Sequence, residues 1–162
     1  MIKRVLVVIS ALAILASGLL FAASAQDGPT PREQAEAATE TRQGLFKLLV
    51  FNLLPIAGMA QGAPFDAEVA ETNARRIAAL APMIPDVLGA MDTRNFDVET
   101  EALDLIWDNM NDIQTKSQAL VDNAIAFADT AAGGDMGATL GAFRALGGSC
   151  GNCHDTYRVD ND

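Results

Sequence analysis

Apolar side chains recur every three or four positions in several long segments of this chain. A helix needs that spacing to bury a single face. Val, Ile, Thr and Tyr, which favour strands, dominate no segment after residue 25, so neither a β-sandwich nor a β-barrel is expected. The pattern predicts an all-α protein, an antiparallel up-down-up-down bundle of four helices joined by short connections.

Prolines and a capping residue set the limits of the first two predicted helices. The first runs from about residue 32 to residue 60, and Pro55 within it is expected to kink it. Asp66 can cap the start of the second helix, because its carboxylate can accept from the first free N–H groups. Pro82 and Pro85 are expected to stop or distort this second helix.

The second half of the chain predicts two more helices. The third fits residues 101–130, after a loop over residues 89–100. Adjacent glycines end it, and Asp135 can cap the fourth helix. One stripe of this last helix consists of Phe143, Leu146, Cys150, Cys153 and Tyr157.

The first 25 residues are typical of an export signal. Lys3 and Arg4 give a cationic start, an apolar stretch covers residues 5–21, and residues 23–25 read Ala-Ser-Ala, as a signal peptidase requires. The alternative is an uncleaved anchor, because the apolar stretch nearly reaches the length of a spanning helix. We expect cleavage, so that residues 26–162 form one folded domain in the periplasm that is not embedded in the membrane.

An excess of acidic residues limits the partners of this chain. There are 11 Lys+Arg against 21 Asp+Glu, a formal net charge of −10. Without Lys3 and Arg4 the balance is 9 against 21, or −12. A surface of this sign repels phosphate backbones, so nucleic-acid binding is not expected. A protein partner would have to present basic residues.

Both cysteines and the only histidine fall within five residues, Cys150-Gly151-Asn152-Cys153-His154. This is the C-x-x-C-H pattern of covalent haem c attachment. Each thiol can form a thioether with one porphyrin vinyl group, and the adjacent imidazole is then held against the iron. A redox pair is disfavoured because no βαβ pattern is present, and a zinc site lacks a fourth His or Cys ligand. Export agrees with haem c, which is attached outside the cytoplasm.

A C-x-x-C-H motif on the last helix of a four-helix bundle resembles the cytochrome c′ family. The similar sequence around the motif is CGNCHDTYR, residues 150–158. The resemblance extends to three other segments, Thr41-Arg42-Gln43, Gly58-Met59-Ala60 and Ile106-Trp107. It covers nearly all of residues 31–158.

The resemblance implies that one haem c is bound by a defined set of side chains. Cys150 and Cys153 form the thioethers, and His154 is the single axial ligand of the iron. Arg42 and Gln43 approach the haem edge, where a guanidinium would pair well with a propionate.

Two further expectations concern the surroundings of the haem. The resemblance places a haem contact on Glu101 or Thr100, in the segment before Trp107. Arg158 follows His154 by four and shares its helix face. By the resemblance, Arg158 lies beside the proximal haem face, where a diatomic ligand can displace the histidine.

The residue on the distal side decides between two haem functions. The family carries an apolar residue four positions after the first-helix arginine, which here is Phe46. Because Phe cannot coordinate iron, an open, five-coordinate, high-spin iron that binds NO or CO is expected, and electron transfer is still allowed. The alternative is a low-spin, six-coordinate electron carrier with a methionine ligand. No methionine lies one turn from Arg42, and Met59 lies about 20 Å further along the helix.

An enzyme is not expected. The only histidine is assigned to the iron, and the sequence offers no distal acid–base group for peroxidase chemistry.

The first predicted helix has apolar residues on two sides. At about 100° per residue, Leu45, Leu49 and Ile56 fall on one face, whereas Val50 and Leu54 fall nearly opposite. A second apolar side on a bundle helix indicates another packing surface, most simply that of a homodimer. The alternative is a set of scattered surface residues, which are common.

Overall fold

Six helices make up the described part of the chain, residues 28–160 of this computed structural model. The predicted export signal and its cleavage site lie outside the described residues. In chain order the helices are α2 (Pro31–Ala60), α3 (Ala67–Leu80), α4 (Met83–Gly89), α5 (Leu105–Asp108), α6 (Met110–Ala132) and α7 (Met136–Tyr157).

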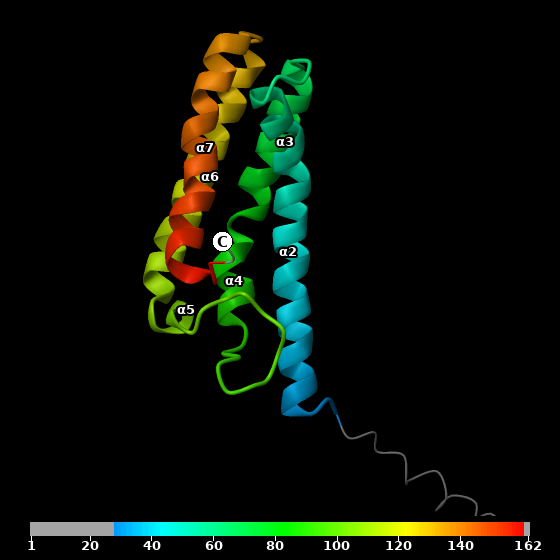
Figure 1. The fold of residues 1–162 in the computed structure, drawn as a ribbon, viewed down its shortest axis with the longest axis vertical. Coiled ribbons are helices and arrows are strands. Elements are labelled where there is room, and N and C mark those ends of the chain that lie inside the picture. Colours follow the sequence, from blue (N-terminus) through cyan, green and yellow to red (C-terminus); the bar gives the residue numbers. More distant parts are fainter. Residues whose placement is uncertain (1–27, 161–162) are drawn as a thin grey trace, which may run out of the picture. The chain divides into compact units, whose positions relative to one another are not determined.

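The four long helices, α2, α3, α6 and α7, form an antiparallel bundle. Each packs mainly on the long helix before it and the long helix after it in the chain. Figure 1 shows α2 and α3 as one pair and α6 and α7 as another, and α3 packs extensively on α6. The core between them includes the fully buried side chains of Ile56, Ile113, Phe127 and Leu146. The predicted all-α bundle is confirmed.

The helix α2 begins where a helix is easiest to start. Pro31 occupies the first position, where its missing N–H costs nothing, and Glu33 interacts favourably with the positive helix end. The helix continues past Pro55 to Ala60. The chain then turns at Gly62, whose φ of +103° is the left-handed conformation that glycine adopts without strain.

The second predicted helix is divided in two by its prolines. Asp66 caps α3 as expected, and its Oδ1 accepts from the Val69 N–H at 3.0 Å. α3 ends at Leu80, and α4 begins directly after Pro82. Pro85 falls in the first turn of α4, where no N–H is required.

The predicted start of the third helix at residue 101 is wrong. Residues 101–104 are not helical, and the helical residues after them divide into the short α5 and the long α6. Ala102 instead forms an isolated antiparallel bridge with Arg158, just after α7. The backbone groups of this segment therefore find partners across the bundle rather than along a helix.

The last helix is capped as the sequence predicts. Asp135 Oδ1 accepts from the Ala138 N–H at 2.7 Å, which begins α7. On the predicted stripe, Leu146 and Tyr157 are buried, whereas Phe143 and both cysteines are half-buried against the core.

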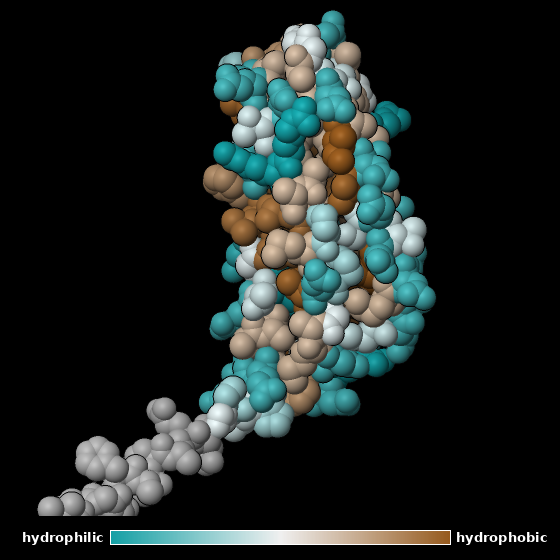
Figure 2. Space-filling view, turned by 180° about the vertical axis from the view of Figure 1, so that it is seen from behind, coloured by the Kyte–Doolittle hydropathy of each residue, from teal (hydrophilic) through white to brown (hydrophobic). Residues whose placement is uncertain are grey.

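The side of α2 that faces away from the bundle core carries exposed apolar residues. Leu48, Val50, Phe51 and Leu54 are 51%, 51%, 65% and 63% exposed. Figure 2 shows apolar side chains gathered on the α2 side of the back face. By length and composition alone α2 could cross a membrane, a test that core helices of soluble proteins also pass.

Candidate haem site

The helix α7 presents both cysteines and the histidine in its last two turns. Cys150 and Cys153 are free thiols, one turn apart and half-buried against the hydrophobic core. His154 follows directly and is exposed, so its imidazole is accessible. The three side chains predicted to hold haem c therefore lie on one short stretch of a well-packed helix.

The surroundings of these groups favour their neutral forms. Burial raises the pKa of the Cys150 thiol. Burial also raises the pKa of Cys153, where Lys116 acts in the opposite direction. Partial burial of the imidazole, and next the positive charge of Arg158, lower the pKa of His154. A neutral imidazole has the free electron pair that an iron ligand needs.

These residues fit haem c better than they fit a bare metal ion. Among residues 28–160 no three His, Cys, Asp or Glu side chains come together as a metal-binding group. His154 can supply one ligand to an iron whose other in-plane ligands come from a porphyrin. Two accessible thiols one turn away, over an apolar lining, match the covalent attachment of that porphyrin.

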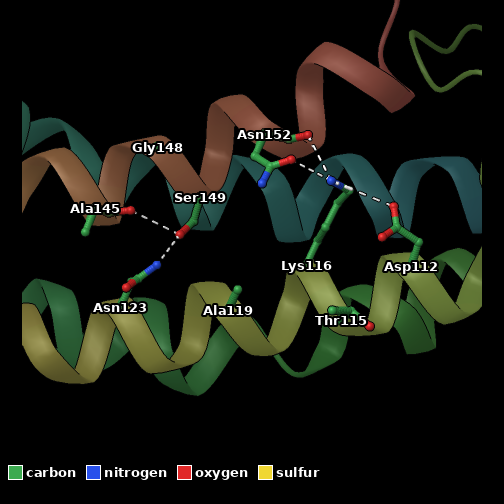
Figure 3. A pocket seen from close by; sticks show the side chains of 9 residues that line it. All are labelled: Asp112, Thr115, Lys116, Ala119, Asn123, Ala145, Gly148, Ser149 and Asn152. Atoms are coloured by element: carbon green, nitrogen blue, oxygen red, sulfur yellow. Dashed lines mark hydrogen bonds and ion pairs between the residues drawn. The ribbon is translucent and has the colours of Figure 1, made fainter.

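Polar contacts fasten α7 to α6 behind the motif. A groove of about 330 Å³ lies between the two helices. Beside it Lys116 Nζ donates to Asn152 Oδ1 at 2.6 Å and Asn123 Nδ2 donates to Ser149 Oγ at 2.8 Å (Figure 3). None of the three motif side chains lines this groove. The two hydrogen bonds join α7 to α6 on a side of α7 that the motif side chains do not line.

Arg42, predicted to approach a propionate, is buried in the protein. Its Nε donates to Val87 O at 2.9 Å, Nη1 donates to Thr93 Oγ1 at 3.0 Å, and Nη2 donates to the carbonyls of Leu88 and Met91. Burial lowers the pKa of its guanidinium. Arg42 thus holds the last turn of α4 and the segment that follows it.

Trp107 completes the surroundings of Arg42. The guanidinium carbon of Arg42 lies 5.3 Å from the indole centroid, and that of Arg94 lies 5.9 Å from it. The indole Nε1 donates to Leu88 O at 3.0 Å. Trp107 was expected at the site only through the family resemblance, and its contacts with two arginines could not be read from the sequence.

Four predicted site residues lie on or beside the segment before α5. Gln43 Nε2 donates to Glu99 O at 3.0 Å, and Thr100 Oγ1 accepts from the Ala102 N–H at 3.1 Å. Glu101 forms an ion pair with Arg158, 2.6 Å between Oε2 and Nη2. The structure thus brings Glu101 and Arg158 together, which the sequence did not predict.

The predicted distal residue, Phe46, lies on α2 and is half-buried. It packs against the core, as do Leu49 and Leu53 further along the same helix. These three side chains give the inner side of α2 an apolar surface.

Tyr157 was expected only as part of the apolar stripe, but it also carries a polar contact. Its hydroxyl donates to Asp112 Oδ2 at 2.6 Å. The (i, i+4) spacing of Asp112 and Lys116 was visible in the sequence, whereas their proximity to α7 depends on helix packing.

An all-α bundle whose final helix carries a C-x-x-C-H motif defines the class of helical-bundle c-type cytochromes. The sequence model described as "Cytochrome C'" matches residues 37–158, most of the chain. The chain therefore belongs to the cytochrome c′ family, a family of non-enzymatic haem proteins, and its two C-terminal cysteines are consistent with covalent haem c.

Relatives from one bacterium support this assignment. Cytochrome c-554 of Cereibacter sphaeroides is 38% identical over 152 residues, covering 93% of this chain and 96% of that protein. Cytochrome c′ of the same organism is 35% identical over 150 residues, covering 91% of this chain and 95% of the relative.

Solved structures share the fold over most of their length. One is a cytochrome c′ described as having an unusual ligand-controlled dimer dissociation, with a TM-score of 0.70 and 28% identity over 83% of this chain and all of that one. Another is a ferrous variant of cytochrome c prime from Alcaligenes xylosoxidans with bound NO, with a TM-score of 0.67 and 26% identity over 78% of this chain and 97% of that one.

Proposed function

We propose that this protein is a haem c protein in which His154 is the single axial ligand from the chain, and which binds NO or CO on the opposite side. The observation that carries the proposal is Phe46, one turn beyond Arg42, which has no atom able to coordinate iron. Phe46 is half-buried with Leu49 and Leu53 on the inner side of α2. An apolar wall of these side chains would supply neither a ligand to the haem iron nor a hydrogen bond to a diatomic molecule bound there.

The chain's own residues would hold the group and set its direction. Cys150 and Cys153 would tether it through thioethers, and His154, kept neutral by its surroundings, would bind the iron. The haem would supply the iron at which the diatomic ligand binds. The packing of α7 on α6 fixes the helix from which all three side chains project.

Arg42 and Gln43 would act at the haem edge in different ways. Arg42 already donates to three carbonyls and to Thr93. Because a guanidinium has five N–H groups, one on Nη1 remains for a propionate. We expect Arg42 first to hold residues 87–93 in place, and Gln43 to hold Glu99.

NO is proposed as a ligand because a structurally similar cytochrome c prime has been solved with bound NO. CO is proposed with it, since both are neutral diatomic molecules that bind ferrous haem without a distal donor. Electron transfer through the same haem is compatible with this proposal.

The test is an absorption spectrum of the purified holoprotein, first ferric, then reduced with dithionite, then exposed to CO and to NO. We expect a broad ferrous Soret band without sharp α and β bands, and a shift when either gas is added. A sharp low-spin spectrum that CO does not change would overturn the proposal and make the protein a six-coordinate electron carrier.

Two methionine variants make the test specific to Phe46. Phe46→Met would place a thioether on the inner side of α2, and we expect it to give sharp α and β bands and to suppress CO binding. Phe51→Met changes the same residue type on the exposed side of the helix and is expected to leave the spectrum unchanged.

We further propose that the protein is exported to the periplasm. The cationic and apolar first 21 residues and the Ala-Ser-Ala at 23–25 support an export signal. Mass spectrometry of the periplasmic fraction is expected to find a chain that begins at Gln26. A chain retaining Met1 in the membrane fraction would contradict cleavage.

We also propose that a second copy of this chain covers the exposed side of α2. Four large apolar side chains lie there, each more than half exposed. Exposed apolar surface of this extent on one helix favours a protein contact. A cytochrome c′ of the same fold is described as a dimer that dissociates under ligand control.

A further inference from the structure

The segment before α5 holds the end of α7 by backbone pairing. The Val159 N–H donates to Glu101 O at 2.8 Å, and the Leu103 N–H donates to Tyr157 O at 3.0 Å. Ala102 and Arg158 form the antiparallel bridge between them. We refer to residues 101–103 together with residues 157–159 as the C-terminal clasp.

A side-chain ion pair reinforces the C-terminal clasp. Arg158 Nε donates to Glu101 Oε2 at 2.7 Å, and Arg158 Nη2 forms an ion pair with the same oxygen at 2.6 Å. An exposed ion pair is normally weak, because two long side chains must be ordered to form it. Here the bridge already fixes both backbones, so only the two side chains remain to be ordered when the ion pair forms.

The C-terminal clasp lies within one turn of His154. The Arg158 N–H donates to His154 O at 3.1 Å, which is the last backbone hydrogen bond of α7. The final helical residue, Tyr157, comes three positions after His154. Helix ends fray when nothing holds them, and His154 lies in the part of α7 that would fray.

We propose that Glu101, by holding Arg158 in the C-terminal clasp, fixes the turn of α7 that carries His154 and limits how readily this histidine leaves the iron when NO is bound on the other side. The inference rests on the proposed function. NO bound to the haem iron would weaken the bond between the iron and His154. If the bond breaks, the imidazole leaves with its own electron pair, so no oxidant or reductant is consumed. Glu101 is a positioning residue, since it acts through Arg158 and the helix end.

The experiment compares holoprotein variants that differ by one charge. Glu101→Gln removes the ion pair but keeps the backbone pairing. Glu99→Gln removes the same charge two residues earlier, from an exposed side chain in the same loop. The first readout is the electron paramagnetic resonance spectrum of the ferrous protein with NO, in which hyperfine coupling to the imidazole nitrogen is present only while His154 is bound.

The second readout does not depend on ligand binding. Hydrogen exchange at the Leu103 and Val159 amides measures how often the C-terminal clasp opens in the ferric protein. For Glu101→Gln we expect amide exchange to be about two- to fivefold faster, because one exposed ion pair contributes little to stability. We expect a similar increase in the ratio of the NO form without bound His154 to the NO form with it. Glu99→Gln should match the wild type in both readouts.

The outcomes separate this inference from the proposed function. A wild-type protein that binds neither NO nor CO would overturn the proposed function. If the wild type binds NO, two results overturn the role of Glu101: Glu101→Gln indistinguishable from wild type, or equal shifts in Glu101→Gln and Glu99→Gln.

Discussion

At the residue scale, Tyr157 joins the last turn of α7 to α6 through a single hydrogen bond. Its hydroxyl donates to Asp112 Oδ2 at 2.6 Å, and the ring is buried. This bond raises the pKa of Tyr157 from 10.0 to about 12. The folded protein therefore holds the phenolic proton more tightly than the unfolded chain, and this contribution to stability is complete below pH 10 and lost between pH 10 and 12.

We expect Tyr157→Phe to lower the free energy of unfolding at pH 7 by about 1–2 kcal/mol, because a hydrogen bond to a charged group is lost. The variant should also lose less stability than the wild type between pH 10 and 12. Urea denaturation at a series of pH values measures both effects. Tyr157 is the only tyrosine in the chain, so its titration can be followed by ultraviolet absorption without interference from another.

Asp112→Asn provides the matched control for Tyr157. The amide oxygen can still accept from the hydroxyl, but the negative charge is gone, so the pKa of Tyr157 should fall toward its ordinary value. An unchanged alkaline titration in this variant would show that Asp112 does not raise the pKa of Tyr157.

Arg42 shows what a sequence can and cannot say about one residue. Its type and position on the first helix predicted a charged contact at a haem edge. The structure shows it buried, bound to Thr93 and to carbonyls in the last turn of α4 and just after it, with Trp107 beside it. These partners lie 45 to 65 residues away in the chain, so no local pattern could have predicted them. The propionate contact stays a prediction.

At the element scale, two helices begin at an aspartate that caps them. Asp66 and Asp135 each accept from the N–H three residues later, at 3.0 and 2.7 Å. Asp104 occupies the same position before α5 but makes no side-chain capping bond. A comparison of the three aspartates therefore distinguishes the effect of capping on stability from the effect of a negative charge at the helix start.

We expect Asp66→Ala and Asp135→Ala each to lower the free energy of unfolding by about 1 kcal/mol, the usual cost of a lost N-cap. The two changes should add in the double variant, because the caps belong to different helices and share no contact. Thermal or urea denaturation measures the effect. Asp104→Ala should change stability by less than either, and an equal loss there would mean that charge rather than capping is responsible.

The prediction of the third helix was wrong at its beginning, because that segment forms contacts with another part of the chain. Residues 101–104 have no proline or glycine to stop a helix, so the sequence favoured one continuous segment. Their backbone groups pair with the end of α7 instead. The capping aspartates and the end of α3 before Pro82 were predicted correctly, because both depend on backbone groups within a few residues.

At the scale of the whole molecule, the exposed side of α2 leaves several large apolar side chains in contact with water. Phe51 and Leu54 are 65% and 63% exposed. Burying large apolar side chains in a contact between two copies would remove this surface from water.

We expect Phe51→Ser and Leu54→Ser each to weaken self-association about tenfold or more, as the loss of a central apolar contact does in protein interfaces. Sedimentation equilibrium of the holoprotein measures the dissociation constant. Ile125→Ser, at a 43% exposed position on α6, should leave it unchanged. A wild-type protein that is monomeric at all concentrations would contradict the dimer.

The sequence by itself determined the helical class, the residues that begin α2, α3 and α7, and the motif for haem c, because each depends on residues within one or two turns of each other. Cys150, Cys153 and His154 could be recognised together for the same reason. Only the tertiary structure decided that Glu101 pairs with Arg158 and that Arg42 lies buried beside Trp107. Such contacts join distant segments, and they form only after helix packing has fixed which side chains face each other.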